Sequence, residues 1–137
     1  MNNFAGLYEI RNATADDRNF ILATFLRGVY YGDSWFSMIP KAIFMAHYKK
    51  VAEHLVTSAR VTIACLKDDP NVIIGYSILS PDASTVHWVF VKAMWRRNGV
   101  ARSLVPPSPV AFSHLSALGK TIMTKQFPNT VFNPFAL

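Results

Sequence analysis

The spacing of hydrophobic residues divides the first two-thirds of the chain into helices and strands. Residues 8–12 form a short extended run, which predicts a first strand. Two later segments carry hydrophobic residues at intervals of three and four, as one face of a helix does: Leu22, Phe25, Leu26 and Val29, and then Phe44, Tyr48, Val51 and Leu55. We therefore predict two consecutive helices after the first strand.

Polar and proline residues indicate where these two helices begin. Thr14 is followed three positions later by Asp17, a pair typical of a capping box at a helix start. Pro40 can occupy the first turn of the second helix, because a backbone N–H group is not needed there.

Three more strands are expected after the helices. Residues 60–66 and 72–80 are hydrophobic runs joined by a turn at 67–71, and Pro81-Asp82 makes a turn before the run 84–91. A further helix is expected to start near Gly99. This gives the order β-α-α-β-β-β-α, which is typical of an α+β fold.

The pattern changes after residue 105. Three prolines should interrupt the helix that starts near Gly99, because proline lacks a backbone donor and clashes with the preceding turn: Pro106, Pro107 and Pro109. The spacing of Ala111, Leu115 and Leu118 predicts a short helix that ends at Gly119. Residues 120–127 and 130–135 are then expected to be two final strands.

Composition narrows the class of protein. Of 137 residues, 51% are hydrophobic and 16% are charged, which is typical of a globular chain, and we expect residues 1–137 to form a single domain. Cys65 is the one cysteine, so an internal disulfide is excluded, and its apolar surroundings predict a buried thiol in a reducing compartment. We expect no signal peptide, no membrane span and no metal site, and a cytoplasmic protein.

Charge is distributed unevenly along the chain. The formal net charge is +6, yet all eight carboxylates lie at or before Asp82. The remainder of the chain carries six basic residues and no acidic one: Lys92, Arg96, Arg97, Arg102, Lys120 and Lys125. Three of these six lie close together after the strand 84–91, which indicates an anionic partner.

The segment that follows this strand carries a recognisable motif. The sequence Arg96-Arg97-Asn98-Gly99-Val100-Ala101 resembles the acetyl-CoA signature (Arg/Gln)-x-x-Gly-x-(Gly/Ala) of the GCN5-related N-acetyltransferases. Val91 stands five residues before Arg96, as the last strand residue does in that family. The resemblance covers roughly residues 8–105. It implies a mixed central sheet of about six strands flanked by helices, here with an abridged C-terminal lobe.

The resemblance also implies where acetyl-CoA would bind. In the family, the strand before the motif splays from the next strand, and the pantetheine arm pairs with backbone groups in the gap. The matching backbone groups here belong to Val89, Phe90 and Val91. The pyrophosphate would lie on the motif and the residue after it: Arg96, Arg97, Asn98, Gly99, Val100, Ala101 and Arg102.

The catalytic groups are less typical of the family. Many members use a Glu on the motif strand and a Tyr in the C-terminal lobe, but here residues 84–91 hold no carboxylate and Tyr76 is the last tyrosine. His87 is the titratable residue on that strand and a candidate base, and alternation predicts that it shares a face with Val89 and Val91. Asp33 is a second candidate.

The loop between the first two helices is the expected acceptor site, since the family places much of its acceptor site there. Its candidate acceptor-lining residues are Tyr30, Tyr31 and Trp35. Ser113 and His114 have no motif support, and we expect them at the surface.

Three functions are consistent with these features. The first is an acetyl-CoA-dependent N-acetyltransferase that acts on an amine of a small molecule or protein, with a homodimer as one possible assembly. The second is a catalytically inactive relative that acts by binding a protein partner. The third, the least favoured, is nucleic-acid binding through the basic C-terminal part, with stacking on Trp88, Phe90 and Trp95.

Overall fold

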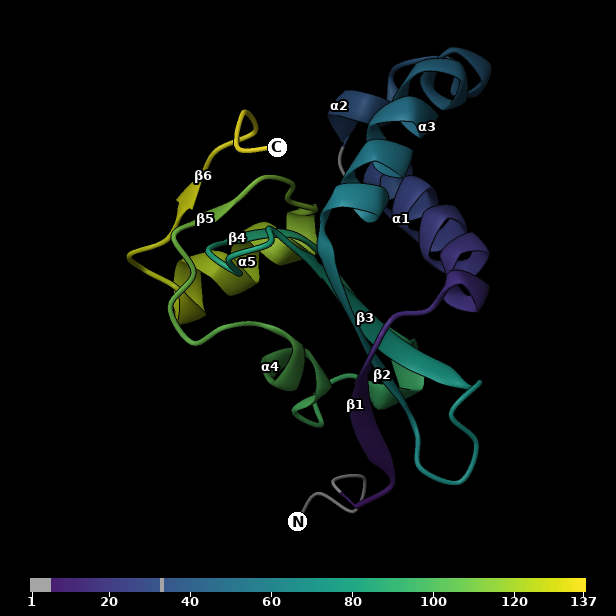
Figure 1. The fold of residues 1–137 in the computed structure, drawn as a ribbon. Helices are drawn as coiled ribbons and strands as arrows, with labels where there is room; N and C mark the ends of the chain where they lie inside the picture. Colours follow the sequence, from purple (N-terminus) through teal and green to yellow (C-terminus); the bar gives the residue numbers. More distant parts are fainter. Residues whose placement is uncertain (1–5, 33) are drawn as a thin grey trace.

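A six-stranded sheet runs through the molecule and carries helices on both faces (Figure 1). The structure is a computed structural model that describes residues 6–32 and 34–137. Its strands are β1 (Tyr8–Asn12), β2 (Arg60–Leu66), β3 (Ile73–Leu79), β4 (Thr85–Val91), β5 (Ala111–Phe112) and β6 (Val131–Phe132). Its helices are η1 (Ala15–Asp17), α1 (Arg18–Gly32), α2 (Ser34–Ser37), α3 (Lys41–Ser58), η2 (Ala93–Trp95), α4 (Val100–Leu104) and α5 (Ala117–Gln126).

The strands follow one another in the sheet in the order in which they follow along the chain. Strands β1 to β4 pair antiparallel, whereas β4 with β5 and β5 with β6 pair parallel. The sheet is therefore mixed and the fold is α+β, as predicted. β3 lies in the middle of the core, because all seven of its residues are buried.

Each face of the sheet has its own layer of helices. Helices α1 and α3 cover one face, where the largest core cluster includes Phe25, Phe44, Leu55 and Tyr76. On the other face, α4 packs over Ile74 and Val91, and residues of α5 pack against Phe112. Cys65 is fully buried in the first of these clusters, as its surroundings predicted.

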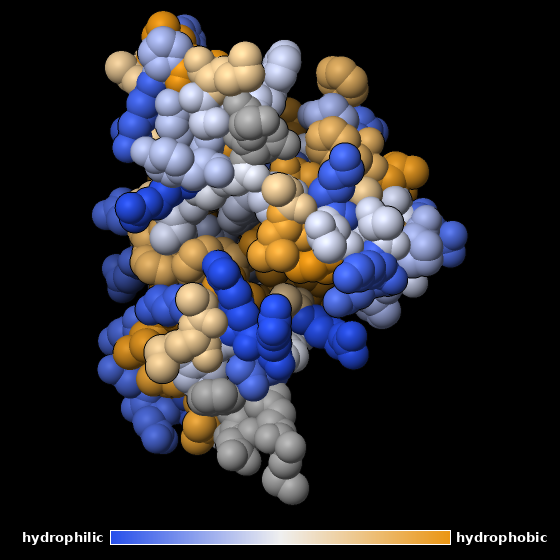
Figure 2. Space-filling model, turned by 180° about the vertical axis from the view of Figure 1, so that it is seen from behind, coloured by the Kyte–Doolittle hydropathy of each residue, from blue (hydrophilic) through white to orange (hydrophobic). Residues whose placement is uncertain are grey.

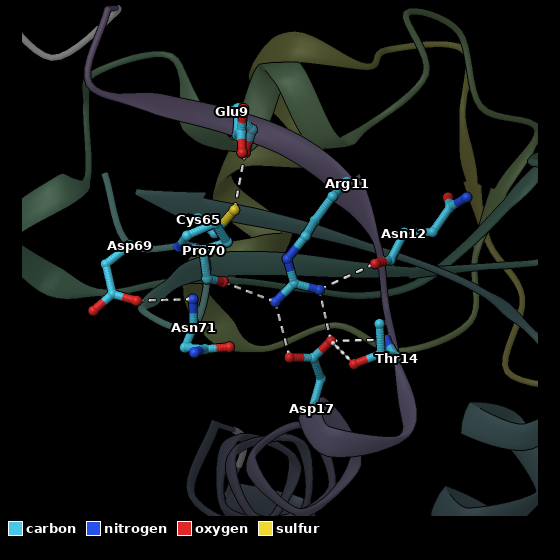
Figure 3. A network of polar contacts seen from close by, with 9 residues as sticks. All are labelled: Glu9, Arg11, Asn12, Thr14, Asp17, Cys65, Asp69, Pro70 and Asn71. Atoms are coloured by element: carbon cyan, nitrogen blue, oxygen red, sulfur yellow. Dashed lines mark hydrogen bonds and ion pairs between the residues drawn. The ribbon is translucent and has the colours of Figure 1, made fainter. Parts of the chain in front are cut away.

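A network of polar contacts joins β1 to the start of the first helical segment (Figure 3). The guanidinium of Arg11 donates to both carboxylate oxygens of Asp17, at 2.7 and 2.9 Å, and to the carbonyl of Pro70 in the β2–β3 turn, at 3.0 Å. Asp17 also accepts from the N–H group of Thr14 at 2.7 Å, so the predicted capping box is confirmed. The hydrogen bond from Arg11 is the main cause that holds the pKa of Asp17 below its ordinary value of 3.8.

The predictions for the C-terminal segment are wrong. Residues 111–116 form no helix, because Ala111 and Phe112 pair with β4 as strand β5 and α5 begins only at Ala117. The helix lies later, at α5, where residues 120–127 were expected to be a strand. Ser116 caps it by accepting from the N–H group of Gly119 at 2.9 Å, so this glycine lies at the beginning of a helix and not at an end.

Hydrophobic spacing explains this helix once β5 is in place. Leu115, Met123 and Phe127 recur at helical intervals and all pack against the cluster around Phe112. The last strand is only Val131–Phe132, shorter than the predicted 130–135. The interruption of the motif helix by prolines is confirmed, since α4 ends at Leu104 after five residues.

Several large hydrophobic side chains remain at the surface. Figure 2, a view from behind, shows hydrophobic groups in the middle of that face with hydrophilic side chains around them. Eight of the exposed side chains belong to two segments: the α1–α3 connection (Tyr31, Trp35, Met38, Ile43) and the end of the chain (Val131, Phe132, Phe135, Leu137). Within residues 6–32 and 34–137, no helix combines the length and the hydrophobicity that a membrane span requires.

Replacing Asp17 should destabilise the protein. Asp17→Asn keeps the size of a side chain that is 5% exposed but removes the charge that Arg11 pairs with, and hydrogen bonds to charged groups contribute about 1.5–3 kcal/mol each. We expect the free energy of unfolding, from urea titration at pH 7, to fall by about 1–3 kcal/mol. Because the pKa of Asp17 is lowered in the folded state, its contribution is present above pH 3.8 and is lost as the pH falls further.

Asp16→Asn is the matched control, since Asp16 is the exposed neighbour in the same turn. It should change the free energy of unfolding by less than about 0.5 kcal/mol. Equal losses in the two variants would contradict the role given to Asp17.

Candidate functional site

Strand β4 separates from β5 almost as soon as the two strands have paired. The pairs are Thr85 with Ala111 and Val86 with Phe112, and the last contact is the N–H group of Ser113, which donates to the carbonyl of Val86 at 3.0 Å. β4 then continues to Val91 beside β3 alone. One edge of β4 is therefore open from residue 87 onwards.

The backbone groups along this open edge can be assigned from the pairing with β3. The N–H group of Lys92 donates to Ile74 at 2.9 Å, so the alternation of an antiparallel pair directs the backbone of Phe90 toward Tyr76 of β3. The N–H groups of Val89 and Val91 then face the open edge. The carbonyl of Val91 is already occupied, because it accepts from Nε of Arg96 at 3.1 Å.

The motif residues form a turn at the end of this edge. Gly99 has φ of +81° and caps α4, and a Cβ atom built on it would meet nothing within 4 Å. Arg97 also has a positive φ, of +63°. Helix α4 begins at Val100 with Gly99 as its N-cap, and the first N–H groups of a helix have no partner within the helix. The side chains of Arg96, Arg97 and Arg102 are exposed around this turn. It is thus a basic loop with available donors and open space above its glycine.

His87 occupies a β-bulge at the point where the two strands separate. Leu79 of β3 pairs with Val86 and Ile78 pairs with Trp88, which leaves His87 without a partner. A bulge of this kind interrupts the alternation of side chains. His87 and Trp88 consequently both face the α1–α3 layer, and the prediction that His87 shares a face with Val89 and Val91 is wrong.

A chain of hydrogen bonds leads from His87 into that layer. Nδ1 of His87 lies 2.6 Å from Oγ of Ser113, which lies 2.8 Å from Nδ1 of His114. Nε2 of His114 contacts the hydroxyl of Tyr48 on α3. Ser113 is 3% exposed and His114 is half-buried, so their expected place at the surface is wrong. They follow β5, a strand of two residues that alternation cannot reveal.

Burial keeps every member of this chain uncharged near neutral pH. It lowers the pKa of His87 below its ordinary value of 6.5. It lowers the pKa of His114 to about 4, with a smaller contribution from repulsion by His87. Burial also raises the pKa of Tyr48. His87 therefore has a lone pair available at physiological pH.

His87 also lines a hollow of about 490 Å³ between the end of α3 and the β3–β4 turn. Nε2 of His87 makes no hydrogen bond to any described residue. Among the described residues, the fully buried side-chain polar atoms without a hydrogen-bond partner are Ser77 Oγ and Trp88 Nε1, so Nε2 of His87 is not sealed from solvent. Asp82 lines the same hollow and has a pKa lowered to about 2 by hydrogen bonds, first from the Ser84 hydroxyl.

The predicted acceptor residues that the structure describes are not brought to His87. Asp33 lies outside the described residues. Tyr30 is buried and donates from its hydroxyl to the carbonyl of Ile39 at 2.7 Å, as a core residue does. Tyr31 and Trp35 are 59% and 71% exposed, and neither lines the hollow. In residues 6–32 and 34–137, no three His, Cys, Asp or Glu side chains are grouped so that they could hold a metal ion.

Comparison with known proteins identifies the architecture through solved structures. No protein-family model matches the sequence, and no curated protein does. YjaB from Escherichia coli, in its apo form, aligns with a TM-score of 0.50 at 17% identity, over 72% of this chain and 61% of that one. GCN5-related N-acetyltransferases from Rhodopseudomonas palustris and Kribbella flavida align with TM-scores of 0.49 and 0.47 at 14% and 21% identity, again over 72% and 61%.

The chain shares its fold with YjaB, a mixed six-stranded sheet with helices on both faces. This confirms the fold that the resemblance implied, while identities of this size say nothing about activity. The chain spans about 61% of the length of each of these three structures.

The packing of three aromatic residues bears on the nucleic-acid hypothesis. Trp95 is 9% exposed and packs between β2, β3 and α4, and Trp88 and Phe90 pack against the α1–α3 core. The ring faces that would stack on bases are therefore occupied by the core of the fold. This packing argues against the three aromatics as a stacking surface.

The low pKa of His114 should appear in the pH dependence of stability. A group whose pKa is about 4 in the folded state and 6.5 when unfolded stabilises the fold fully above pH 6.5 and loses that contribution between pH 6.5 and 4. The loss should reach roughly 2–3 kcal/mol. His114→Gln, which cannot titrate, should show a shallower fall in urea midpoints from pH 7 to 4.5.

His47→Gln serves as the control, because His47 is exposed on α3. Its pH dependence should match that of the parent. A His114→Gln curve with the parent's slope would show that His114 is not buried in its neutral form.

Proposed function

We propose that the protein is an acetyl-CoA-dependent N-acetyltransferase that transfers the acetyl group to an amine. The observation that carries this proposal is the open edge of β4, which runs from the buried His87 to the basic loop around Gly99. A thioester held along this edge would end beside the side chain best suited to act as a base. The names of the similar structures from Rhodopseudomonas palustris and Kribbella flavida point to the same activity.

The residues along the edge fit the chemistry of CoA. A pyrophosphate needs hydrogen-bond donors and positive charge, and the loop offers the N–H groups at the start of α4 with three exposed arginines around them. The space above Gly99 is the part of the loop that a side chain would fill. The N–H groups of Val89 and Val91 suit the amide groups of a pantetheine arm.

The mechanism assigns separate tasks to the two ends of β4. Acetyl-CoA supplies the activated thioester. An amine acceptor enters the hollow beside His87, where the carboxylate of Asp82 attracts its positive charge. A lysine-like amine of pKa about 10.4 must lose a proton before it attacks, at a cost of about 4 kcal/mol near pH 7.4. Nε2 of His87 accepts this proton, and general base catalysis of this kind typically contributes about 10²–10⁴-fold. Attack of the amine nitrogen on the thioester carbonyl would form the amide bond and break the C–S bond, so that CoA leaves as its thiolate.

A binding protein without turnover is the second candidate. It is favoured by the absence of a carboxylate in residues 84–91 and of any tyrosine after Tyr76, the positions where many relatives carry their acid and base. Acetyl-CoA binding without acetyl transfer to any amine in a broad acceptor screen would support this candidate over the first.

Gly99→Glu should abolish binding of acetyl-CoA. The variant places a negative side chain in the space above the loop, and CoA at about 100 times its Kd would stabilise the parent by about 2.7 kcal/mol. We expect a melting shift with millimolar acetyl-CoA in the parent and none in the variant.

Gly99→Gln is the matched control for size and for the strain of a side chain at positive φ. It should weaken binding less than Gly99→Glu does, because it adds no charge. The absence of a melting shift in the parent would refute the proposed function, and equal affinity of parent and Gly99→Glu would refute this location.

His87→Gln tests the base. We expect kcat for acetyl transfer at pH 7 to fall by about 10²–10⁴-fold while the Kd of acetyl-CoA stays the same. The loss should shrink as the pH rises, because the free amine becomes more abundant. A variant with a rate near that of the parent at pH 7 would remove His87 from the mechanism.

A further inference from the structure

The hydrogen-bonded chain that ends at His87 has no part in the mechanism above. Its members come from three separate elements: His87 from β4, Ser113 and His114 from the segment after β5, and Tyr48 from α3. The helical layer screens it, since Phe25 of α1 packs edge-on against the ring of His114 at 5.5 Å. A continuous polar chain through an apolar layer is costly unless every group in it is satisfied.

We propose that Tyr48, His114 and Ser113 form a relay that carries a proton away from His87, as positioning residues behind the base. This inference rests on the proposed function in taking His87 as the base. The geometry of the relay stands without it, because each link is a contact between named atoms.

Counting hydrogens shows that the chain has two complete states. In the first, His87 donates from Nδ1 to Ser113, Ser113 donates to Nδ1 of His114, and His114 donates from Nε2 to the oxygen of Tyr48. In the second, every bond is reversed: Tyr48 donates to Nε2 of His114, Nδ1 of His114 donates to Ser113, and Ser113 donates to Nδ1 of His87. Each histidine is neutral in both states, as burial requires.

Proton transfer from an amine converts the first state into the second. In the first state Nε2 of His87 has a lone pair and accepts the proton, and its Nδ1 proton moves to Ser113. The hydroxyl proton of Ser113 moves to His114, and the Nε2 proton of His114 moves to Tyr48. Tyr48 is half-buried and releases its own hydroxyl proton to water. One proton enters at His87 and one leaves at Tyr48, so no buried group stays charged.

The other groups near His87 do not provide this path. His54 and Asp82 share the hollow with it, together with Leu137 at the last position of the chain. Among the described residues, neither His54 nor Asp82 makes a hydrogen bond to His87, and Asp82 is engaged with the hydroxyls of Ser80 and Ser84 at 2.8 and 2.7 Å. The chain through Ser113 is thus the direct link from His87 to another titratable side chain.

The two states make a prediction about the free protein. Because the bonds reverse together, the fraction of His87 protonated at Nδ1 should equal the fraction of His114 protonated at Nε2. Both fractions can be measured by ¹⁵N NMR of histidine-labelled protein between pH 6 and 8, without any ligand. Ser113→Ala should remove this equality and Ser113→Thr, which keeps the hydroxyl, should retain it. Unequal fractions in the parent, or an equality that survives in Ser113→Ala, would overturn the relay.

Activity gives a second, independent readout. Tyr48→Phe should lower kcat at pH 7 by about 10- to 100-fold with an unchanged Kd for acetyl-CoA, and the loss should shrink as the pH rises. Tyr76→Phe is the matched control, because it also removes a core hydroxyl, one that contacts Thr24 at 2.6 Å outside the relay. Equal losses in the two variants would overturn the relay.

The two readouts separate failure of the relay from failure of the proposed function. Coupled tautomers in a protein that transfers no acetyl group would leave the relay standing and refute the enzyme. Acetyl transfer by a protein whose tautomers are uncoupled would refute the relay and leave the enzyme.

Discussion

The early separation of β4 from β5 is the constraint on which the rest of the structure depends. Two pairs of residues hold these strands together, and the contact ends at Val86. From that point β4 has a free edge on one side, a bulge at His87, and a basic loop at its far end. If β4 and β5 paired for a few more residues, the backbone N–H groups of Val89 and Val91 would form hydrogen bonds within the sheet and would not be available to a ligand. A strand that remains open in the middle of a sheet needs support from elsewhere, and here β3 supplies it along the whole length of β4.

Local signals predicted the first two-thirds of the fold because each element there is long enough to show its period. The helical stripes of α1 and α3, the capping pair Thr14 and Asp17, and the runs of β2 to β4 can all be found within a window of the sequence. The sequence-based predictions were wrong where an element depends on residues far away along the chain. β5 has two residues and exists because Thr85 and Val86 lie beside it, so no alternation could reveal it. The sequence did not reveal β5, against which α5 packs. The hydrophobic residues of α5 were therefore predicted to form a strand.

The candidate site also has one part that the sequence could predict and one part that it could not. The loop of residues 96–101 could be predicted as an anion site because a glycine at fixed spacing from arginines is a local pattern. The sequence could not predict the hydrogen-bonded chain behind His87, because its members are far apart. Ser113 lies 26 positions from His87, and Tyr48 lies 66 positions from His114. The orientation of His87 was also missed, because one bulge reverses the side that a residue faces, and a β-bulge has no sequence signature in a hydrophobic strand.

The burial of the two histidines connects stability to function. A solvated imidazole is half-protonated near pH 6.5, whereas burial keeps His87 and His114 neutral at physiological pH and so keeps a base available. The same burial destabilises the fold in acid, when both rings gain a charge on unfolding. His87 accepts a proton on the side of its ring that borders the hollow, and its hydrogen-bonded neighbour on the other side of the ring can take a proton from it. Ser113 is suited to this position, because a hydroxyl can donate and accept at once and can reverse both roles without moving its oxygen.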